Sequence, residues 1–329
     1  MKKKKKYNVA ILGIRGAVGQ EMYRIVKERK FPVDELRLIS RVEGQQDGIK
    51  YRMLDKNCFD GIDIVLSSPG AELSAKWVPV AVKAGAVVID NTSYFRMDPN
   101  VPLVVPEVNP EDIKKHKGII ANPNCSTIQM VVALKPLHDY AKIKRIIVST
   151  YQAVSGAGAE GGRELEDQVK KIVKKKSFTI RKFAYQIAHN LIPQIDVFVD
   201  NHYTKEEMKM VNETQKIMHD KNIKVSATCV RVPVYNSHSE SVNIETSKKI
   251  SRAKAIALLK KAPGVIVVDN VTKSQYPMPI DADGHDETFV GRIREDETVK
   301  NGLNLWVVSD NLRKGAALNA VQIAEKLIK

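Results

Sequence analysis

Cys125 is the residue whose surroundings point most directly to chemistry. It lies in Asn-Pro-Asn-Cys-Ser-Thr, between an apolar strand-like segment at 118–123 and an apolar helical stretch at 128–137. A cysteine at the start of a helix gains thiolate character from unpaired N–H groups and the helix dipole, and a thiolate can attack a carbonyl or an acyl phosphate to give a thioester. A free cysteine is also often a small buried hydrophobic residue, but the neighbours of Cys125 predict an exposed turn. Cys58 and Cys229 lack this context, and a core or surface position is expected for both.

A thiol nucleophile needs a base, and His238 is one of seven histidines that could serve. It lies in Tyr-Asn-Ser-His-Ser-Glu-Ser between two strand-like segments, which predicts a polar loop of the kind that often carries catalytic residues. A loop histidine taken alone is more often a surface residue. Composition and spacing leave both interpretations of His238 open.

The segment 204–209, Thr-Lys-Glu-Glu-Met-Lys, predicts the start of a helix. Thr204 followed three residues later by Glu207 is a capping-box pattern. Glu206 and Lys209 are three residues apart and share one face of that helix. Such a pair is commonly a surface salt bridge of little energetic value. The functional alternative is a lysine that binds phosphate and is held by the glutamate.

Two arginines occupy positions suited to anion binding. Arg231 falls inside an otherwise apolar strand-like segment at 224–234. Because a buried unpaired guanidinium is costly, we expect it to face a cleft, where it could bind a carboxylate through paired hydrogen bonds. Arg96 follows the apolar segment 86–90, at the sheet edge where ligands bind in open α/β folds.

A glycine-rich turn separates the first strand-like segment, 7–13, from a helical pattern that begins near Ala17. Gly13, Gly16 and Gly19 form Gly-x-x-Gly-x-x-Gly there. Glycines let the backbone approach a pyrophosphate closely, and the helix N-terminus supplies free N–H groups. A purely structural turn is the alternative, but the position after the first strand of a βαβ series favours dinucleotide binding.

The end of the second strand-like segment, 35–40, bears on the choice of cofactor. NAD-specific sites place an acidic residue there to bind the ribose 2′-hydroxyl. Here Ser40 and Arg41 come first, and Glu43 follows two residues later. A guanidinium suits a 2′-phosphate, so the sequence favours NADP, although Glu43 stands close by.

The elements that must position these residues differ between the two halves of the chain. In the first half, apolar strand-like segments alternate with helical ones, which predicts βαβ units and a parallel sheet. The second half contains mostly strand-like segments with a few helices, which predicts an α+β domain with a mixed or antiparallel sheet. The final helical stretch, about 313–328, follows the last strand and can return to the first domain. We therefore expect an α/β protein with a Rossmann-like parallel-sheet domain (1–125 plus 311–329) and a second α+β catalytic and dimerisation domain (126–310).

Length and composition are those of an ordinary soluble two-domain protein. The chain has 329 residues, 43% hydrophobic and 28% charged. No run approaches the length of a membrane span, and three cysteines without CxxC spacing argue for a reducing cytoplasm and against a disulfide framework or a structural zinc site. The net charge of +15 suits small anionic substrates. The lysines are scattered without interleaved aromatic residues, so we expect neither nucleic-acid nor membrane binding, and no metal.

Taken together, the motifs resemble the aspartate-β-semialdehyde dehydrogenase family across essentially the whole chain. The matching segments are GIRGAVG, SYFRMDPNVPLVVPEVN, NPNCST, YQAVSGAG, EEMK, CVRVPVYNSHSES and SDNLRKGAA. The resemblance implies catalytic roles for Cys125, His238 and Gln152. It implies substrate binding by Arg96, Asn124, Glu206, Lys209 and Arg231. Together with the residues at the end of the second strand-like segment, the resemblance implies NADP binding. The residues are Gly13, Arg15, Gly16, Ala17, Val18, Gly19, Ser40, Arg41, Ser155, Gly156 and Asn311.

The same resemblance implies a reaction and an assembly. Cys125 would displace phosphate from β-aspartyl phosphate, NADPH would reduce the thioester, and His238 would act as acid/base while aspartate semialdehyde forms. The step would serve lysine, threonine and methionine biosynthesis. A homodimer is implied, with a tetramer as the alternative and the second-domain sheet at the interface.

Two departures from the family pattern and three rival interpretations accompany this expectation. Val42 replaces a serine that helps to hold the 2′-phosphate, and Pro69 stands where alanine is common. The rivals are N-acetyl-γ-glutamyl-phosphate reductase, a non-catalytic homologue, and a nucleic-acid-binding protein. The presence of Cys125, Gln152 and His238 argues against a non-catalytic homologue, and the spacing of Arg231 and His238 favours the aspartyl substrate.

Overall fold

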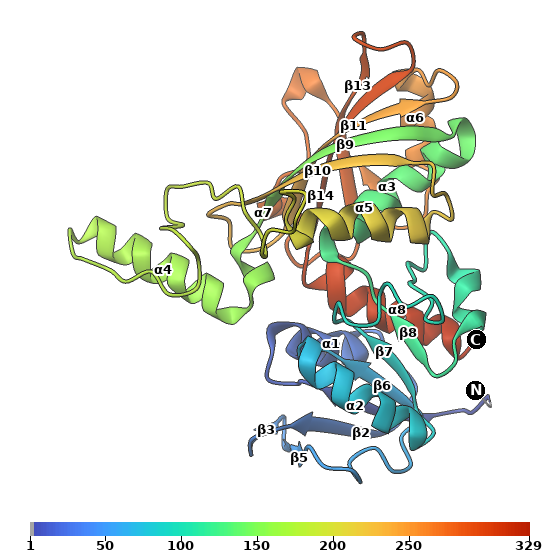
Figure 1. The fold of residues 1–329 in the computed structure, drawn as a ribbon, viewed down its shortest axis with the longest axis vertical. Helices are drawn as coiled ribbons and strands as arrows, with labels where there is room; N and C mark the ends of the chain where they lie inside the picture. The colour runs from blue at the N-terminus through green and yellow to red at the C-terminus, as the bar shows by residue number, and fades with distance from the viewer. Residues whose placement is uncertain (1–2) are drawn as a thin grey trace. The chain divides into compact units, whose positions relative to one another are not determined.

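The computed structural model describes residues 3–329. The chain forms two compact units. Unit 1 comprises Met1–Asn124 and Ala316–Lys329, and unit 2 comprises Cys125–Gly315. Figure 1 shows the ribbon with its elements labelled.

Unit 1 contains a six-stranded sheet in the order β5-β2-β1-β6-β7-β8, in which every neighbouring pair is parallel. Its strands are β1 (Tyr7–Leu12), β2 (Val33–Ser40), β5 (Arg52–Met53), β6 (Ile64–Ser67), β7 (Val87–Asp90) and β8 (Ile119–Ala121). Counted along the chain, these strands have the order 3-2-1-4-5-6 of a dinucleotide-binding fold. The predicted Rossmann-like parallel sheet is confirmed. A short hairpin, β3 (Gln45–Gln46) and β4 (Ile49–Lys50), follows β2.

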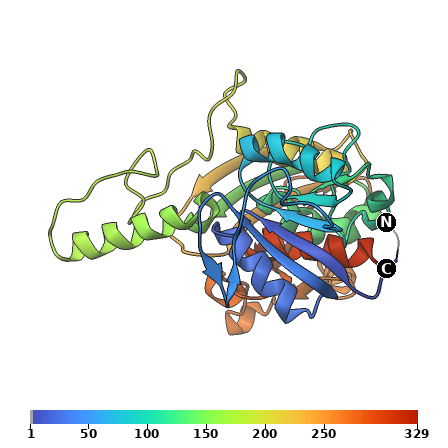
Figure 2. The ribbon, with the colours of Figure 1, turned by 90° about the horizontal axis from the view of Figure 1, so that it is seen from below.

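Helices cover both faces of this sheet. They are α1 (Ala17–Glu28), α2 (Ala71–Lys83), the 3-10 helix η1 (Pro110–Lys115) and α8 (Leu318–Leu327). Right-handed crossovers that leave β1 in one direction and β6 in the other place α1 and α2 on opposite faces, as Figure 2 shows, with α8 beside α1. Apolar side chains of α1 and α8, among them Ile25, Leu318 and Val321, are fully buried against the sheet.

Unit 2 contains a mixed six-stranded sheet in the order β10-β9-β11-β14-β13-β12. Its strands are β9 (Ile143–Gln152), β10 (Lys224–Arg231), β11 (His238–Thr246), β12 (Val265–Val267), β13 (Thr288–Asp296) and β14 (Gly302–Ser309). The two outer pairs are parallel and the inner three antiparallel. The expectation of an α+β domain with a mixed sheet is confirmed.

One face of this second sheet is covered and the other is open. The covering helices are α3 (Cys125–Ala141), α5 (Lys205–Ile217) and α6 (Arg252–Leu259). Side chains therefore alternate along β9, where Ile146 and Val148 are buried while Ile147 is 37% and Tyr151 36% exposed. On the open face the ring of Tyr151 lies 5.4 Å from that of Trp306, centroid to centroid. The open face thus presents apolar and aromatic side chains.

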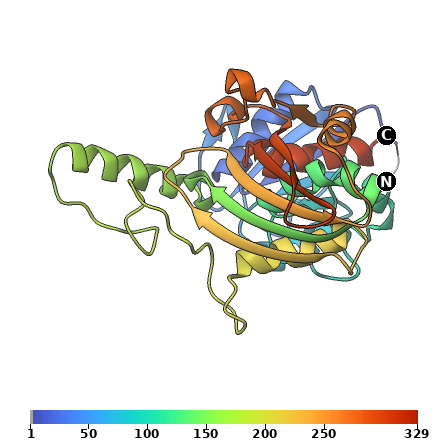
Figure 3. The same ribbon diagram turned by 90° about the horizontal axis from the view of Figure 1, so that it is seen from above.

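An arm extends from unit 2 beyond its sheet, as Figures 1 and 3 both show. It consists of α4 (Ala159–Val173) and the irregular segment up to Thr204. A small cluster that includes Leu165, Ile187 and Ile192 closes its base. Short elements complete the unit: η2 (Val154–Ala157), η3 (Val271–Lys273), α7 (Pro279–Ala282) and the π-helix η4 (Arg313–Ala317), which leads into α8. Between residues 3 and 329 no helix has the length and apolar character needed to span a membrane.

Candidate active site

The glycine turn of unit 1 has the backbone geometry of a phosphate-binding loop. Gly13 has φ +90°, and a Cβ there would lie 2.7 Å from the carbonyl oxygen of Ser68, so only glycine lets β1 end this close to β6. Gly16 precedes α1 as its N-cap without a side-chain cap, which leaves the N–H groups of the first turn available to an anion. Gly19 packs so tightly on Gly13 that a side chain would collide with the Gly13 carbonyl.

A cavity of ≈ 470 Å³ opens beside this turn. It brings together five of the predicted cofactor residues, namely Gly13, Arg15, Gly16, Ser40 and Arg41. Val42 and Pro69, the two departures from the family pattern, also line it, whereas Glu43 does not. Ala17, Val18 and Gly19 lie outside the lining, in the first turn of α1. The residues present fit a bound nucleotide, because the cavity lies beside the glycine turn and Arg41 lines it at the end of β2.

Arg96 and Asn124, predicted to bind substrate, lie in unit 1 and are both buried. Arg96 donates from Nε to the carbonyl of Asn122 (2.9 Å) and from Nη2 to the carbonyl of Asn91 (2.9 Å). Asn122 is itself held, because its Oδ1 accepts from Nδ2 of Asn319 on α8 (2.7 Å). The arginine therefore braces the chain between β8 and Cys125.

Cys125 is the first residue of α3 and is partly exposed. Its neighbours Asn124, Ser126 and Thr127 are buried, so the predicted exposed turn is wrong. The reason is local packing: η4 passes close by, and a Cβ on Gly315 would lie 2.8 Å from the Cβ of Cys125. The thiol group thus stands at a helix N-terminus, as predicted, but in a more enclosed place.

His238 corrects a second expectation. It is not in a polar loop but is the first residue of β11, and it is fully buried. Its Nδ1 accepts a hydrogen bond from the backbone N–H of Ala153 (3.0 Å), while its Nε2 has no partner within residues 3–329. Burial first, and then the charge of Arg231, lower the pKa of His238 to about 3, against an opposite effect of Glu206. The neutral ring therefore carries its proton on Nε2.

Arg231 faces the same place from the end of β10. Its Nη1 donates to the carbonyl of Ala153 (2.6 Å). A Cβ on Gly156 would meet both Arg231 Nη1 (2.9 Å) and His238 Nε2 (3.3 Å), so Gly156 leaves the space between these two groups open. Burial lowers the pKa of Arg231, whereas Glu206 and Cys125, close enough to act on its charge, raise it. A small site with two hydrogen-bond donors thus lies near Cys125.

Gln152 links this site to α5. Its Oε1 accepts from Thr150 Oγ1 (3.0 Å), and its Nε2 donates to Glu206 Oε1 (3.2 Å). The other oxygen of Glu206 accepts from Lys209 Nζ (3.0 Å). The predicted capping box of Thr204 and Glu207 is present at the start of this helix and fixes where it begins. The structure therefore brings the glutamate and lysine together with the predicted glutamine.

The remaining predicted cofactor residues of unit 2 also cluster. Asn311 Nδ2 donates to Ser155 Oγ (3.0 Å), and Asn311 Oδ1 accepts from the backbone N–H of Ser237 (2.9 Å). Ser155 and Gly156 belong to η2, which follows β9. This contact connects the chain before His238 to η2.

Sequence reasoning missed three polar residues of this region. Asp196, in the arm, contacts Lys209 Nζ (2.9 Å), and no sequence pattern signals it. Glu240 is fully buried, and neither of its carboxyl oxygens has a hydrogen-bond partner within residues 3–329. Gln129 lies close enough to lower the Glu240 pKa, although burial has the larger effect and raises it well above 4.5. Spacing could have found this pair, since Gln129 is one turn after Cys125 and Glu240 is two strand residues after His238.

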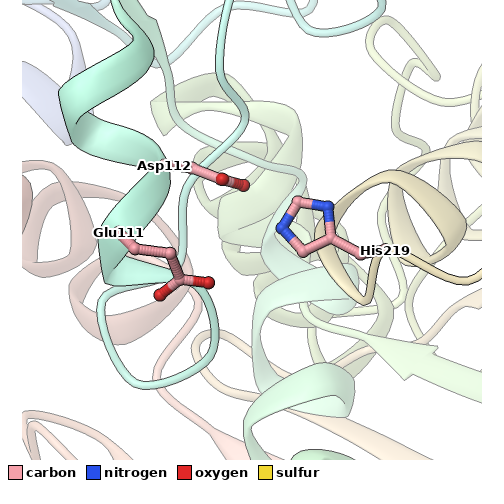
Figure 4. Close-up of side chains that lie close together, drawn as sticks. All are labelled: Glu111, Asp112 and His219. Carbon is pink, nitrogen blue, oxygen red and sulfur yellow. The ribbon is translucent and has the colours of Figure 1, made fainter.

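Three groups with metal-binding side chains appear in Figure 4, namely Glu111, Asp112 and His219. Glu111 and Asp112 belong to η1 of unit 1, and His219 follows α5 in unit 2. Because they come from different units, no metal site is assigned to them.

Comparison with known protein families matches nearly the whole chain. Residues 8–116 match the model "Semialdehyde dehydrogenase, NAD binding domain", and residues 134–314 match "Semialdehyde dehydrogenase, dimerisation domain". The aspartate-semialdehyde dehydrogenase of Aquifex aeolicus is 59% identical over 98% of each chain.

Solved structures agree with this result. The enzyme II of Vibrio cholerae complexed with ASA is 49% identical over 99% of each chain, with a TM-score of 0.93. The Candida albicans enzyme with NADP is 26% identical over 97% of this chain and 98% of that one, with a TM-score of 0.72. By sequence and by fold, the chain belongs to the aspartate-semialdehyde dehydrogenase family.

Proposed function

We propose that this chain catalyses the NADPH-dependent reductive dephosphorylation of β-aspartyl phosphate to aspartate semialdehyde through a thioester on Cys125. One observation carries the proposal. Unit 2 alone gathers Cys125, Gln152, Arg231 and His238 beside the Glu206–Lys209 pair. This set supplies a nucleophile, a proton donor, a carboxylate-binding cation and a phosphate-binding cation.

The first half-reaction is acyl transfer. The Cys125 thiolate attacks the acyl carbon, the bond from that carbon to the phosphate oxygen breaks, and phosphate leaves as the thioester forms. The guanidinium of Arg231 binds the substrate carboxylate, which fixes the acyl carbon close to the sulfur. Lys209 binds the phosphate, and Arg96 and Asn124 are proposed to assist it.

The second half-reaction is reduction of the thioester. The bound nicotinamide supplies the hydride. Negative charge then develops on the acyl oxygen, and the Nε2–H of His238 is the donor placed to bind it. Release of the Cys125 thiolate completes the aldehyde.

The hydrogen bond from Ala153 constrains what His238 can do. While Nδ1 accepts from Ala153, the neutral ring can donate from Nε2 but has no lone pair there to accept the thiol proton. In this geometry His238 therefore serves the reduction as a hydrogen-bond donor to the developing oxyanion, and to act as a base it would first have to release Ala153.

For the cofactor, we propose NADP over NAD. Arg41 lines the unit 1 cavity and Glu43 does not, which suits a 2′-phosphate. Gly13, Arg15, Gly16, Ala17, Val18 and Gly19 would hold the pyrophosphate, and Ser155, Gly156 and Asn311 the nicotinamide. The Candida relative's NADP complex supports this assignment.

For the assembly, we propose a homodimer formed through unit 2. The matched dimerisation model covers this unit. The open face of its sheet and the arm both expose large apolar side chains, including Tyr151 (36%), Leu191 (58%) and Phe198 (57%). The three cysteines are free, which fits the reducing cytoplasm as the compartment.

The test is nicotinamide absorbance with aspartate semialdehyde, phosphate and NADP, in parallel with NAD. We expect reduction of NADP that depends on phosphate, its loss in Cys125→Ala, and its retention in the matched control Cys58→Ala. Folded protein that reduces neither cofactor would contradict the proposal. Full turnover by Cys125→Ala would contradict a mechanism that passes through a thioester on Cys125.

A further inference from the structure

Lys209 forms ion pairs with two carboxylates. Its Nζ lies 3.0 Å from Glu206 Oε2 and 2.9 Å from Asp196 Oδ2. Burial lowers the pKa of Lys209, but Glu206 and Asp196 together outweigh burial and raise it, so the lysine is a cation flanked by two anions. The three groups together carry a net negative charge, so the two carboxylates oppose the approach of a phosphate dianion to Lys209.

The two carboxylates are held very differently. Glu206 is on the same helix as Lys209, its side chain is 7% exposed, and its second oxygen is bonded by Gln152. The Asp196 side chain is 34% exposed, and among residues 3–329 its second oxygen accepts only from the N–H of the adjacent Val197 (2.9 Å). Asp196 is therefore the carboxylate that can be exchanged.

The backbone around Asp196 is anchored on both sides. Ile192 exchanges backbone hydrogen bonds with Arg231 (3.0 and 2.9 Å), and Lys205 N donates to Val197 O (2.9 Å). The segment between these points is thus pinned to the arginine of the proposed substrate site and to the start of α5. Rotation of one side chain can release Lys209 without moving the loop.

We propose that Asp196 is an intramolecular competitor for Lys209 and thereby sets the affinity of the site for phosphate. Its carboxylate oxygen occupies the place that a phosphate oxygen takes when substrate binds. This inference rests on the proposed role of Lys209 as a phosphate ligand. A loop tether is the simpler role for Asp196, and the two roles predict opposite effects of removing its charge.

The experiment measures KM for phosphate in the oxidative direction for Asp196→Asn. Loss of a partly exposed ion pair that opposes binding is expected to lower this KM about two- to fivefold. The KM for aspartate semialdehyde should not change. Asp196→Glu keeps the charge and should stay near the unaltered enzyme. The matched control is Asp200→Asn, because Asp200 lies in the same loop, is exposed and has no hydrogen bond or ion pair in the described part of the chain.

Three results separate the possible failures. An unchanged or raised phosphate KM in Asp196→Asn would contradict the proposed competition with phosphate and would leave Asp196 with the role of a loop tether. Lys209→Met should raise the phosphate KM, and adding Asp196→Asn to it should have no further effect. If Lys209→Met leaves the phosphate KM unchanged, the proposed phosphate site itself is wrong. If Asp196→Asn does not fold, Asp196→Ser takes its place, and the same change in the phosphate KM is expected.

Discussion

At the scale of single residues, the site contains two fully buried ionisable side chains whose pKa values are both shifted toward the neutral form. Burial lowers the pKa of His238 to about 3 and raises the pKa of Glu240 well above 4.5. Both lie on β11, two residues apart, and Gln129 donates from Nε2 to the backbone carbonyl of His238 (3.3 Å). The charged groups close to the reaction proposed above include Arg231, Glu206, Lys209 and Asp196, and the last three form one ion-paired group.

Glu240 should make the protein less stable as the pH rises. Below pH 4.5 the carboxyl is protonated in both the folded and the unfolded chain and has no effect. Above it the unfolded chain ionises while the folded chain keeps its proton, so stability is lost until the raised pKa is reached. We expect Glu240→Gln to melt at the same temperature as the unaltered protein near pH 4 and progressively higher toward pH 7. Thermal melts across this range measure it.

The matched control is Glu245→Gln, farther along the same strand, where the side chain is only partly buried. Its melting temperature should follow that of the unaltered protein at every pH. A constant offset between Glu240→Gln and the unaltered protein would show that folding does not raise the pKa of Glu240.

At the scale of elements, the π-helix η4 packs closely against the proposed nucleophile, Cys125. Gly315 is its central residue and lies against the start of α3. We expect Gly315→Ala to lower kcat at least tenfold, since a Cβ at 2.8 Å from the Cβ of Cys125 must displace the sulfur from its working position. Steady-state kinetics and the rate of Cys125 alkylation measure this displacement.

Gly162→Ala is the control for a glycine replaced within a helix. On α4 the nearest atom to an added Cβ is a carbon of the Tyr235 ring at 4.0 Å, so activity should be kept. If Gly315→Ala has the kcat of the unaltered protein, η4 accommodates the added methyl group without displacing Cys125.

The elements were more predictable than the side chains around them. The apolar runs 7–13 and 86–90 predicted parallel strands, because a strand buried on both faces is a continuous apolar run. The Thr204–Glu207 pattern located the start of α5. The sequence did not show that β11 begins at His238, because Ser-His-Ser-Glu looks like a polar loop. Tertiary packing buries all four residues.

The candidate site was predictable where a residue type is unusual for its element. Arg231 in an apolar strand and Cys125 before an apolar helix both stood out. Asp196 did not, because its partner is distant in sequence and its loop has no periodic pattern. The roles of Gln152 and Asn311 came from the family resemblance, and the structure gives them neighbours but tests no function.

At the scale of the whole molecule, unit 2 has a face that the chain itself leaves uncovered. Ile147→Asp would place a charge on the open face of the sheet, the face that also carries the Tyr151–Trp306 ring pair. We expect it to convert the proposed dimer to a monomer, because a desolvated unpaired carboxylate opposes association strongly. Light scattering after size-exclusion chromatography measures the mass.

Met53→Asp serves as the control, since Met53 is similarly exposed but lies on the edge strand β5 of unit 1. It should leave the mass unchanged. A dimer that persists in Ile147→Asp would place the interface elsewhere, with the arm as the next surface to alter.

The position of α8 has a consequence for the order in which the protein can be made. Unit 1 needs α8 to cover β6 and β7, yet all of unit 2 is encoded between Asn124 and Ala316. During vectorial synthesis the parallel sheet therefore emerges before unit 2 with the part of one apolar face beside α1 uncovered, and unit 2 can fold before that part is covered. The sheet of unit 1 is therefore completed only after the whole of unit 2 has been synthesised.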